Sequence, residues 1–289
     1  MMSSRSPTNN NSPATICYIR CVIRFLIFSL LCLNLAPGHK AMAQNRPANA
    51  RIATRLSTTD SIRMVLVRGG TFDMGSNRNA AEQPVHSVTV GSFYMSIYEI
   101  TMEQWEVVTG YNYSSYRNCR QCAMEGVSWN EVQVFLEELN RRTGKHHRLP
   151  TESEWEYAAR GGHYQSNYIY SGSNNIRDVA SVYTEGMPEA ARRTQTVGQH
   201  KPNELGIYDM NGNLQEWCSD WYDEHYYEKR EGNNPRGPSS GIARVYRGGF
   251  YASYPQFMTN TCRRQDPEHY AVPSSNWPTL GFRIVRDVD

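Results

Sequence analysis

The chain has 289 residues, of which 30 are Lys or Arg and 28 are Asp or Glu. The first 43 residues contain four basic residues and no acidic one, so the remaining 246 residues carry a net charge of −2. This near-neutral balance, without a basic run, excludes a nucleic-acid-binding protein, which needs clustered positive charge. A charged fraction of 20%, with 19 Tyr, 8 Phe and 6 Trp, also excludes a disordered chain.

The N-terminal segment has the pattern of a secretory signal peptide. Two arginines precede an apolar stretch over 25–35, and Ala41-Met42-Ala43 matches a signal-peptidase site. Eleven helical residues rise only about 16 Å, roughly half of a bilayer core, which is too short for a membrane-spanning anchor. We therefore predict a cleaved signal peptide over 1–43 and an exported protein, in the periplasm, at the cell surface or outside the cell. A lipoprotein attached through Cys32 and an uncleaved anchor are the alternatives.

The predicted folded part begins with strands. Residues 44–62 are polar and lack an apolar period, so we predict a flexible lead-in there and one domain over 63–289. The stretches 64–67 and 71–74 resemble two strands joined by a tight turn at Gly69-Gly70. The stretches 86–90 and 93–97 resemble a second pair, joined around Gly91-Ser92.

Three helices are then predicted by capping boxes, in which Ser or Thr is followed three residues later by Gln or Glu. The three boxes are Thr101 with Gln104, Ser128 with Glu131, and Thr151 with Glu154. Glycines at positions 110, 144 and 161 mark the helix ends.

The remaining stretch, 163–280, is rich in Gly, Asn, Pro and Tyr, and strand-like pieces occur only at 244–246 and 281–286. A folded stretch of this length needs support other than regular secondary structure. We therefore predict one loop-rich α+β domain that is stabilised by disulfides and a metal.

Four cysteines remain after the leader, namely Cys119, Cys122, Cys218 and Cys262. An even number in an exported chain favours two disulfides. Pairing Cys119 with Cys122 and Cys218 with Cys262 is the simplest of the three possibilities. Zinc at Cys119-x-x-Cys122 is the alternative, although no second close pair completes a tetrahedral site.

Six motifs follow one another in a fixed order. They are Arg68-Gly69-Gly70-Thr71-Phe72, Tyr98-Glu99-Ile100-Thr101, Val127-Ser128-Trp129, Arg148-Leu149-Pro150-Thr151-Glu152, Asn203-Glu204-Leu205-Gly206 continuing to Glu216-Trp217, and Arg247-Gly248-Gly249 with Gly281-Phe282-Arg283. Over residues 63–287 this order resembles the formylglycine-generating enzyme (sulfatase-modifying factor) family. The resemblance implies a variant of the C-type-lectin-like fold with little regular secondary structure.

Enzymes of that family oxidise a sulfatase cysteine with O2 and copper(I), which two thiolates hold in a C-x4-C spacing between the Arg-Gly-Gly and Gly-Phe-Arg sequences. In this chain the segment 250–280 contains Cys262 as its single cysteine. Counting from Gly249 places Ser253 and Met258 at the ligand positions, and counting back from Phe282 places Pro255 and Asn260 there. Neither pair supplies the soft thiolates that copper(I) prefers, so we do not expect copper.

The resemblance also implies a calcium site, whose ligands correspond to Asp209, Gly212, Leu214 and Glu216. Hard oxygen donors on a tight loop containing glycine independently suit Ca²⁺. The alternative is an Asx turn followed by a glutamate that pairs with an arginine. A second family site would fall near Ser181, Val182, Glu189 and Ala191, where the pattern is blurred.

Two classes of function remain. The first is a non-catalytic binding or assembly module, whose loops and aromatic side chains recognise a protein, peptide or glycan. The second is an enzyme, either a formylglycine-generating oxidase with Cys262 as the catalytic thiol or an uncharacterised chemistry in the same groove. The missing thiolate pair favours the first class.

Overall fold

The structure is a computed structural model that describes residues 62–114, 116–263 and 278–288. The predicted signal peptide over 1–43 lies outside the described residues, and so does the predicted lead-in except for Ile62. In the described ranges no helix is both long enough and apolar enough to cross a membrane.

The four N-terminal strands form one long antiparallel ribbon. β1 (Met64–Val67) pairs with β4 (Phe93–Ser96), and β2 (Gly70–Met74) pairs with β3 (His86–Val90). The register that joins Val67 to Phe93 continues unchanged where Gly70 faces Val90. The two short hairpins predicted from the sequence are therefore wrong, and the reversal of the chain lies between β2 and β3.

The glycine pair read as a turn is instead the place where the two strands of the ribbon approach closely. A Cβ on Gly69 would lie 2.6 Å from the carbonyl oxygen of Val90, and the Gly69 amide donates to Ser92 Oγ at 2.9 Å. Glycine is needed here for close approach rather than for a reversal of direction.

The three helices predicted from capping boxes are confirmed. They are α2 (Met102–Thr109), α3 (Trp129–Thr143) and α4 (Glu152–Ala159), and all three reciprocal capping boxes are present. Gly110 and Gly144 end the first two with left-handed backbones, at φ 85° and 67°.

An extension of the first sheet and one further sheet complete the strand arrangement. β5 (His147–Arg148) and β9 (Val285–Asp287) extend the first sheet to the order β1-β4-β9-β5. A three-stranded sheet has the order β7-β6-β8, with β6 (Gln215–Trp221), β7 (Arg244–Arg247) and β8 (Leu280–Gly281). The sequence missed β6 because most of its residues are buried on both faces, polar ones included, so it shows no polar–apolar alternation.

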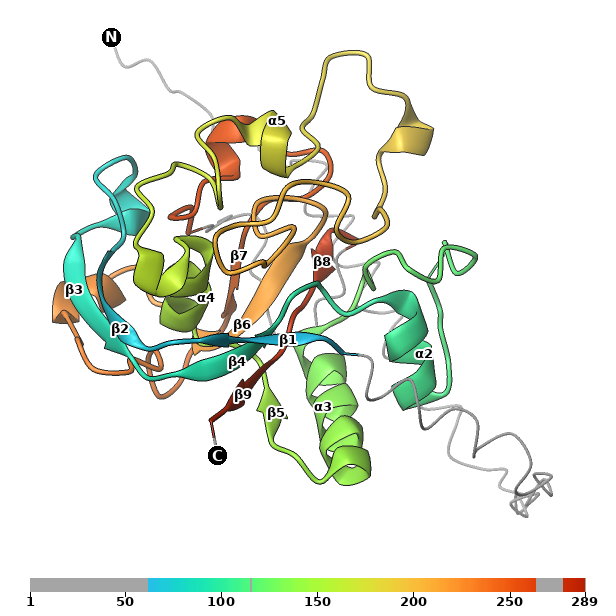
Figure 1. Cartoon of the computed structure of the whole chain (residues 1–289), viewed down its shortest axis with the longest axis horizontal. Helices are drawn as coiled ribbons and strands as arrows, with labels where there is room; N and C mark the ends of the chain where they lie inside the picture. The colour runs from blue at the N-terminus through green and yellow to red at the C-terminus, as the bar shows by residue number, and fades with distance from the viewer. Residues whose placement is uncertain (1–61, 115, 264–277, 289) are drawn as a thin grey trace, which may run out of the picture. The chain divides into compact units, whose positions relative to one another are not determined.

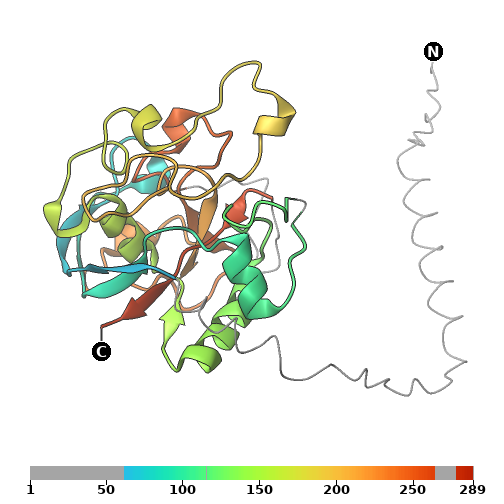
Figure 2. The same cartoon turned by 45° about the vertical axis from the view of Figure 1, so that its right-hand side comes forward.

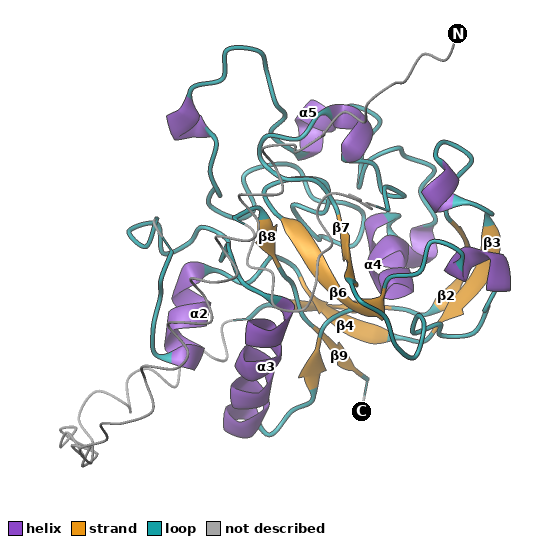
Figure 3. Cartoon of the chain, turned by 180° about the vertical axis from the view of Figure 1, so that it is seen from behind, coloured by secondary structure: helices purple, strands orange, loops and turns teal. Residues whose placement is uncertain are grey.

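The described part of the chain between α4 and β8 consists mainly of loops, as expected (Figure 3). Its short helical turns are η3 (Gly162–Tyr164), α5 (Ile176–Val179), η4 (Glu189–Ala191), η5 (Tyr226–Lys229) and η6 (Pro255–Phe257), and η2 (Ala80–Glu82) lies in the ribbon's turn. The mixed content of helices and strands makes this an α+β fold.

Among the described residues, two large apolar clusters form most of the core. α4 packs against β2, β3, β6 and β7 (Figure 1), and this cluster contains Trp155 and Cys218. α2 and α3 lie side by side (Figure 2), and their cluster includes Trp105, which stacks on Phe135 with centroids 5.3 Å apart. β6 separates the two clusters and supplies side chains to both.

Candidate functional site

The glutamates of α4 are buried, and an arginine from another part of the chain neutralises each of them. The pairs are Glu152 with Arg263 (2.8 Å), Glu154 with Arg148 (2.7 Å) and Glu156 with Arg247 (2.5 Å). Burial opposes ionisation of Glu156, but Arg247 and Arg160 outweigh it and hold the pKa of this carboxyl below its ordinary value. Glu152 and Glu156 therefore join α4 to a distant part of the chain, whereas Glu154 pairs with Arg148 six positions before it, and all three carboxylates are engaged.

The predicted calcium loop lies beside another buried arginine. Both carboxylate oxygens of Glu216 accept from Arg283, each at 2.7 Å, and one of them also accepts from Trp155 Nε1 at 2.7 Å. Asp209 has a left-handed backbone, φ 62°, and its Oδ2 accepts from the amide of Gly198 at 2.6 Å. Glu216 thus contacts the guanidinium directly, whereas Asp209 acts on Arg283 only through electrostatic attraction.

Glu99 is a third carboxylate of this cluster, and the sequence analysis did not single it out. It is 1% exposed, and it accepts from the Leu214 amide at 3.0 Å and from Asn213 Nδ2 at 2.6 Å. Burial, together with the negative charges of Asp209 and Glu216, raises the pKa of Glu99 well above its ordinary value. In the sequence, only the motif Tyr98-Glu99-Ile100-Thr101 pointed to Glu99. The motif alone does not show which residues Glu99 contacts.

The charge of this cluster fits a cation, whereas the geometry assigns Glu216 to Arg283. Three carboxylates face one arginine, and burial raises the pKa of Asp209 to about 6. In the described part of the chain no three His, Cys, Asp or Glu side chains converge as a metal site. Calcium would therefore bind Glu216 only if the hydrogen bonds between Glu216 and Arg283 were broken. Calcium binding stays a prediction.

Three of the four positions that correspond to the copper ligands, Ser253, Met258 and Asn260, are buried and engaged elsewhere, and Pro255 is half-buried. Ser253 Oγ accepts from the Phe250 amide at 3.0 Å, and Met258 lies in an apolar cluster with Ile176 and Val179. In the other register, Asn260 Oδ1 accepts from Asn211 Nδ2 at 3.1 Å. Neither register brings two soft donors to a common point, so the residues present do not fit copper(I).

The cysteines follow one of the two predicted pairings. Cys119 and Cys122 form a disulfide, with Cα atoms 5.3 Å apart. The structure does not confirm the predicted bridge between Cys218 and Cys262, which are both buried. Cys218 points into the cluster under α4, and burial raises the pKa of its thiol well above the ordinary value, as expected for an inert core cysteine.

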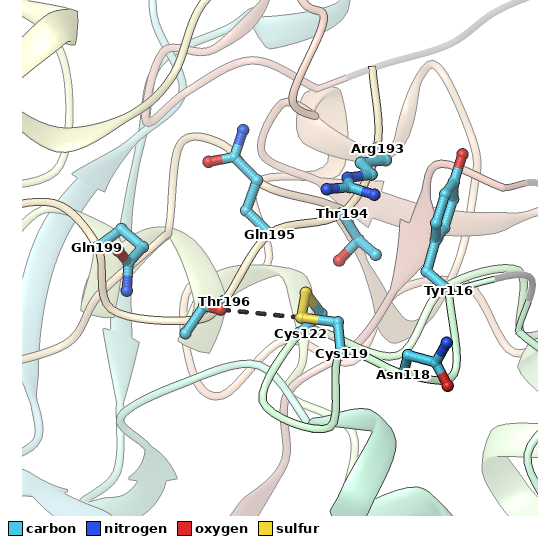
Figure 4. Close-up of a pocket in the computed structure, with 9 residues that line it drawn as sticks. All are labelled: Tyr116, Asn118, Cys119, Cys122, Arg193, Thr194, Gln195, Thr196 and Gln199. Carbon is cyan, nitrogen blue, oxygen red and sulfur yellow. Dashed lines mark hydrogen bonds between the residues drawn. A yellow bond between two sulfur atoms is a disulfide. The ribbon is translucent and has the colours of Figure 1, made fainter. Parts of the chain in front are cut away.

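A cavity of about 610 Å³ lies between two loop segments (Figure 4). Its walls are formed by Tyr116, Asn118, Cys119, Cys122, Arg193, Thr194, Gln195, Thr196 and Gln199. The segments are joined by main-chain hydrogen bonds, from Val197 to Gln121 at 3.1 Å and from Ala123 to Gln195 at 3.2 Å. The volume is in the range of small-molecule and peptide sites. Apart from the two cysteines, no sequence pattern indicated these residues, because a cavity arises from segments distant along the chain.

The capped helices, the short strands and the arginine–glutamate pairs between distant motifs define a loop-rich α+β domain of the sulfatase-modifying-factor type. The family described as "Sulfatase-modifying factor enzyme 1-like domain" matches residues 50–288, and the chain belongs to this family.

Relatives of the chain have several different names. "Chaperone protein LppX" of Paenibacillus barcinonensis is 30% identical, over 81% of this chain and 92% of its own length. "Formylglycine-generating enzyme" of Streptomyces coelicolor is 36% identical, over 56% of this chain and 52% of its own. "Serine/threonine-protein kinase pkn1" of Chlamydia pneumoniae is 30% identical, and the match covers 78% of this chain and 38% of the kinase. These names do not agree on one activity.

Solved structures share the fold. "Treponema denticola variable protein 1" has a TM-score of 0.69 at 25% identity, covering 78% of this chain and 95% of that one. PvdO from Pseudomonas aeruginosa has a TM-score of 0.65 at 25% identity, covering 78% and 94%.

Proposed function

We propose that this chain is an exported binding module of the family that does not carry out copper-dependent oxidation. The observation that carries the proposal is the burial of Ser253 and Met258, which stand where the family holds copper and are engaged in a turn and in an apolar cluster. With Cys262 also buried, no accessible thiolate pair remains in the described part of this segment. A C-type-lectin-like arrangement of the loops belongs to the same proposal, because it supplies a rigid platform for recognition.

The cavity between 116–122 and 193–199 is the proposed binding site. Its lining offers amide and hydroxyl groups together with the Tyr116 ring, which suits the backbone and side chains of a polypeptide. The relative named as a chaperone supports a polypeptide over a glycan, because that match covers 81% of this chain and 92% of the relative.

A site-specific cross-linker tests the binding role. A photoreactive amino acid at Gln199, which lines the cavity, should form a discrete product with a polypeptide in the native host. The same group at Ile242, which is 70% exposed and does not line the cavity, is the matched control. Equal labelling from both positions would contradict the proposed site.

The competing function is formylglycine generation, which the relatives of that name favour. Purified protein would be incubated with copper(I), O2, a reductant and a Cys-x-Pro-x-Arg peptide, and peptide mass would be followed. We expect no conversion to the aldehyde and no stoichiometric copper. Turnover that Cys262→Ser abolishes would establish the oxidase instead.

A further inference from the structure

The disulfide between Cys119 and Cys122 forms part of the cavity wall (Figure 4). Its two halves differ in access, because Cys119 is half-buried whereas Cys122 is 4% exposed. Cys119 Sγ lies 3.8 Å from Thr196 Oγ1, and since a disulfide sulfur carries no proton, the hydroxyl is the donor. The Cys119 sulfur is therefore the sulfur of the disulfide that a ligand in the cavity reaches. The hydroxyl hydrogen of Thr196 lies next to it.

The loop that carries the disulfide is held on both sides by the backbone. The amides of Met102 and Glu103, at the start of α2, donate to the carbonyls of Cys122 and Arg120, both at 2.9 Å. The segment 195–197 pairs with the loop's other side, where Cys122 and Thr196 form an isolated antiparallel bridge. A disulfide that closes a ring of four residues removes little entropy from the unfolded chain. The folded loop is therefore compatible with the dithiol form.

Arg193 gives the cavity a positive charge. It is the charged residue among the described lining residues, and its guanidinium lies 5.5 Å from the centre of the Tyr116 ring. Within the described ranges Arg193 forms no ion pair, whereas the neighbouring Arg120 is neutralised by Glu103 at 2.7 Å. A cation near a disulfide attracts an anionic ligand and favours the thiolate form of an incoming thiol.

From this arrangement we propose that the cavity is a thiol–disulfide exchange site for cysteine thiolates carried on negatively charged peptides. The first thiolate attacks Cys119 Sγ and forms a mixed disulfide, while the bond to Cys122 breaks and its electron pair leaves on Cys122, which takes a proton from water. A second thiolate attacks the substrate sulfur, and the electron pair leaves on Cys119, which is also protonated. Two substrate thiols become one disulfide, and the Cys119–Cys122 disulfide becomes a dithiol. The inference goes beyond the proposed binding role, because it assigns a reaction to the cavity.

The wild-type protein provides the first test. The oxidised protein is mixed with reduced glutathione, a small anionic peptide thiol, and with neutral 2-mercaptoethanol. Free thiols are then alkylated under acid quench and mapped by mass spectrometry. We expect glutathione to reduce Cys119–Cys122 about fivefold faster than 2-mercaptoethanol, after correction for thiolate fraction and nucleophilicity. A bond that survives glutathione in the folded protein, yet is reduced in denaturant, would overturn the proposal.

Two cysteine variants test which sulfur reacts. With oxidised glutathione, Cys122→Ser should form a mixed disulfide at Cys119 about tenfold faster than Cys119→Ser forms one at Cys122, because the second sulfur is buried. Equal rates in two variants that both retain the native circular dichroism would contradict attack at Cys119. If either variant does not fold, peptide mapping of the wild-type mixed disulfide during turnover decides the same point.

An arginine variant tests the charge. Arg193→Gln should slow reduction by glutathione about threefold or more and slow reduction by 2-mercaptoethanol less, because the glutathione thiolate carries more negative charge. Slowing of both thiols to the same extent would show that Arg193 acts on the loop's structure, and the preference for an anionic substrate would be wrong.

Discussion

At the scale of single residues, the charged side chains of the motifs act in buried pairs. Arg283 and Glu216 are both essentially inaccessible to solvent, and two 2.7 Å hydrogen bonds join them. Removing one partner of such a pair leaves the other as an uncompensated buried charge, which costs far more than the net stability of the intact pair. The motif residues by which the family is recognised are therefore structural in this chain.

Replacing Glu216 by Gln should destabilise the fold strongly. The variant keeps an acceptor for Trp155 but leaves the Arg283 guanidinium without its counter-charge, so we expect a loss of about 3–5 kcal/mol in the free energy of unfolding. Urea denaturation measures it. The matched control is Arg141→Ala, which breaks an exposed pair with Glu138 and should leave the midpoint nearly unchanged. Similar midpoints for both variants would refute the buried-pair argument.

Calcium is tested on the same cluster. Because Glu99, Asp209 and Glu216 face a single arginine, a bound divalent cation would relieve their repulsion. We expect dialysis against a chelator to lower the melting temperature and added calcium to restore it. Asp209→Asn should reduce this response without unpairing Arg283. A melting temperature that does not respond to chelator would show that calcium does not stabilise the fold.

At the scale of elements, the long ribbon depends on one close contact between its strands. The strands of β1-β2 and β4-β3 keep one register past Gly69, where a Cβ would meet the main chain of Val90 and Gly91. Backbone cannot move aside as a flexible side chain does, so this contact limits which residue can stand there.

Gly69→Ala should therefore destabilise the protein by roughly 1–3 kcal/mol through overpacking. Gly91→Ala is the control on the partner strand, because its Cβ would meet Asn234 Oδ1 at an ordinary 3.5 Å and nothing closer. Thermal unfolding of both variants measures the difference. A control that is as unstable as Gly69→Ala would show that loss of glycine, rather than the close contact, is responsible.

At the scale of the whole molecule, buried charges make stability depend on pH. Burial, and then the negative charge of Glu152, raises the pKa of Asp220 to about 7. The unfolded chain ionises this carboxyl near its ordinary value of about 4, so its contribution is most favourable below that pH and is lost as pH rises toward 7. His147 acts oppositely, because burial lowers its pKa to about 4 and stability is lost as pH falls from the ordinary value.

Asp220→Asn isolates the first of these effects. The variant cannot ionise, so its stability relative to the wild type should increase between pH 4 and pH 8, by up to about 4 kcal/mol for a shift of three pKa units. Chemical denaturation at several pH values measures this difference. The contribution of His147 to the pH dependence cancels, because both proteins contain this residue. A difference that is constant with pH would mean that Asp220 ionises normally in the folded protein.

The sequence by itself determined the features that local chemistry controls. Three capping boxes predicted three helices, because each depends on residues three positions apart, and the ordered motifs predicted the family. Tertiary structure alone decided which strand pairs with which, that Cys218 lies in the core as a thiol, and that Arg283 holds Glu216. The cavity belongs to this second group, because the segments 116–122 and 193–199 meet only in the folded chain. Contacts between distant segments depend on which faces are buried together, and that information is spread over the whole chain rather than contained in any one motif.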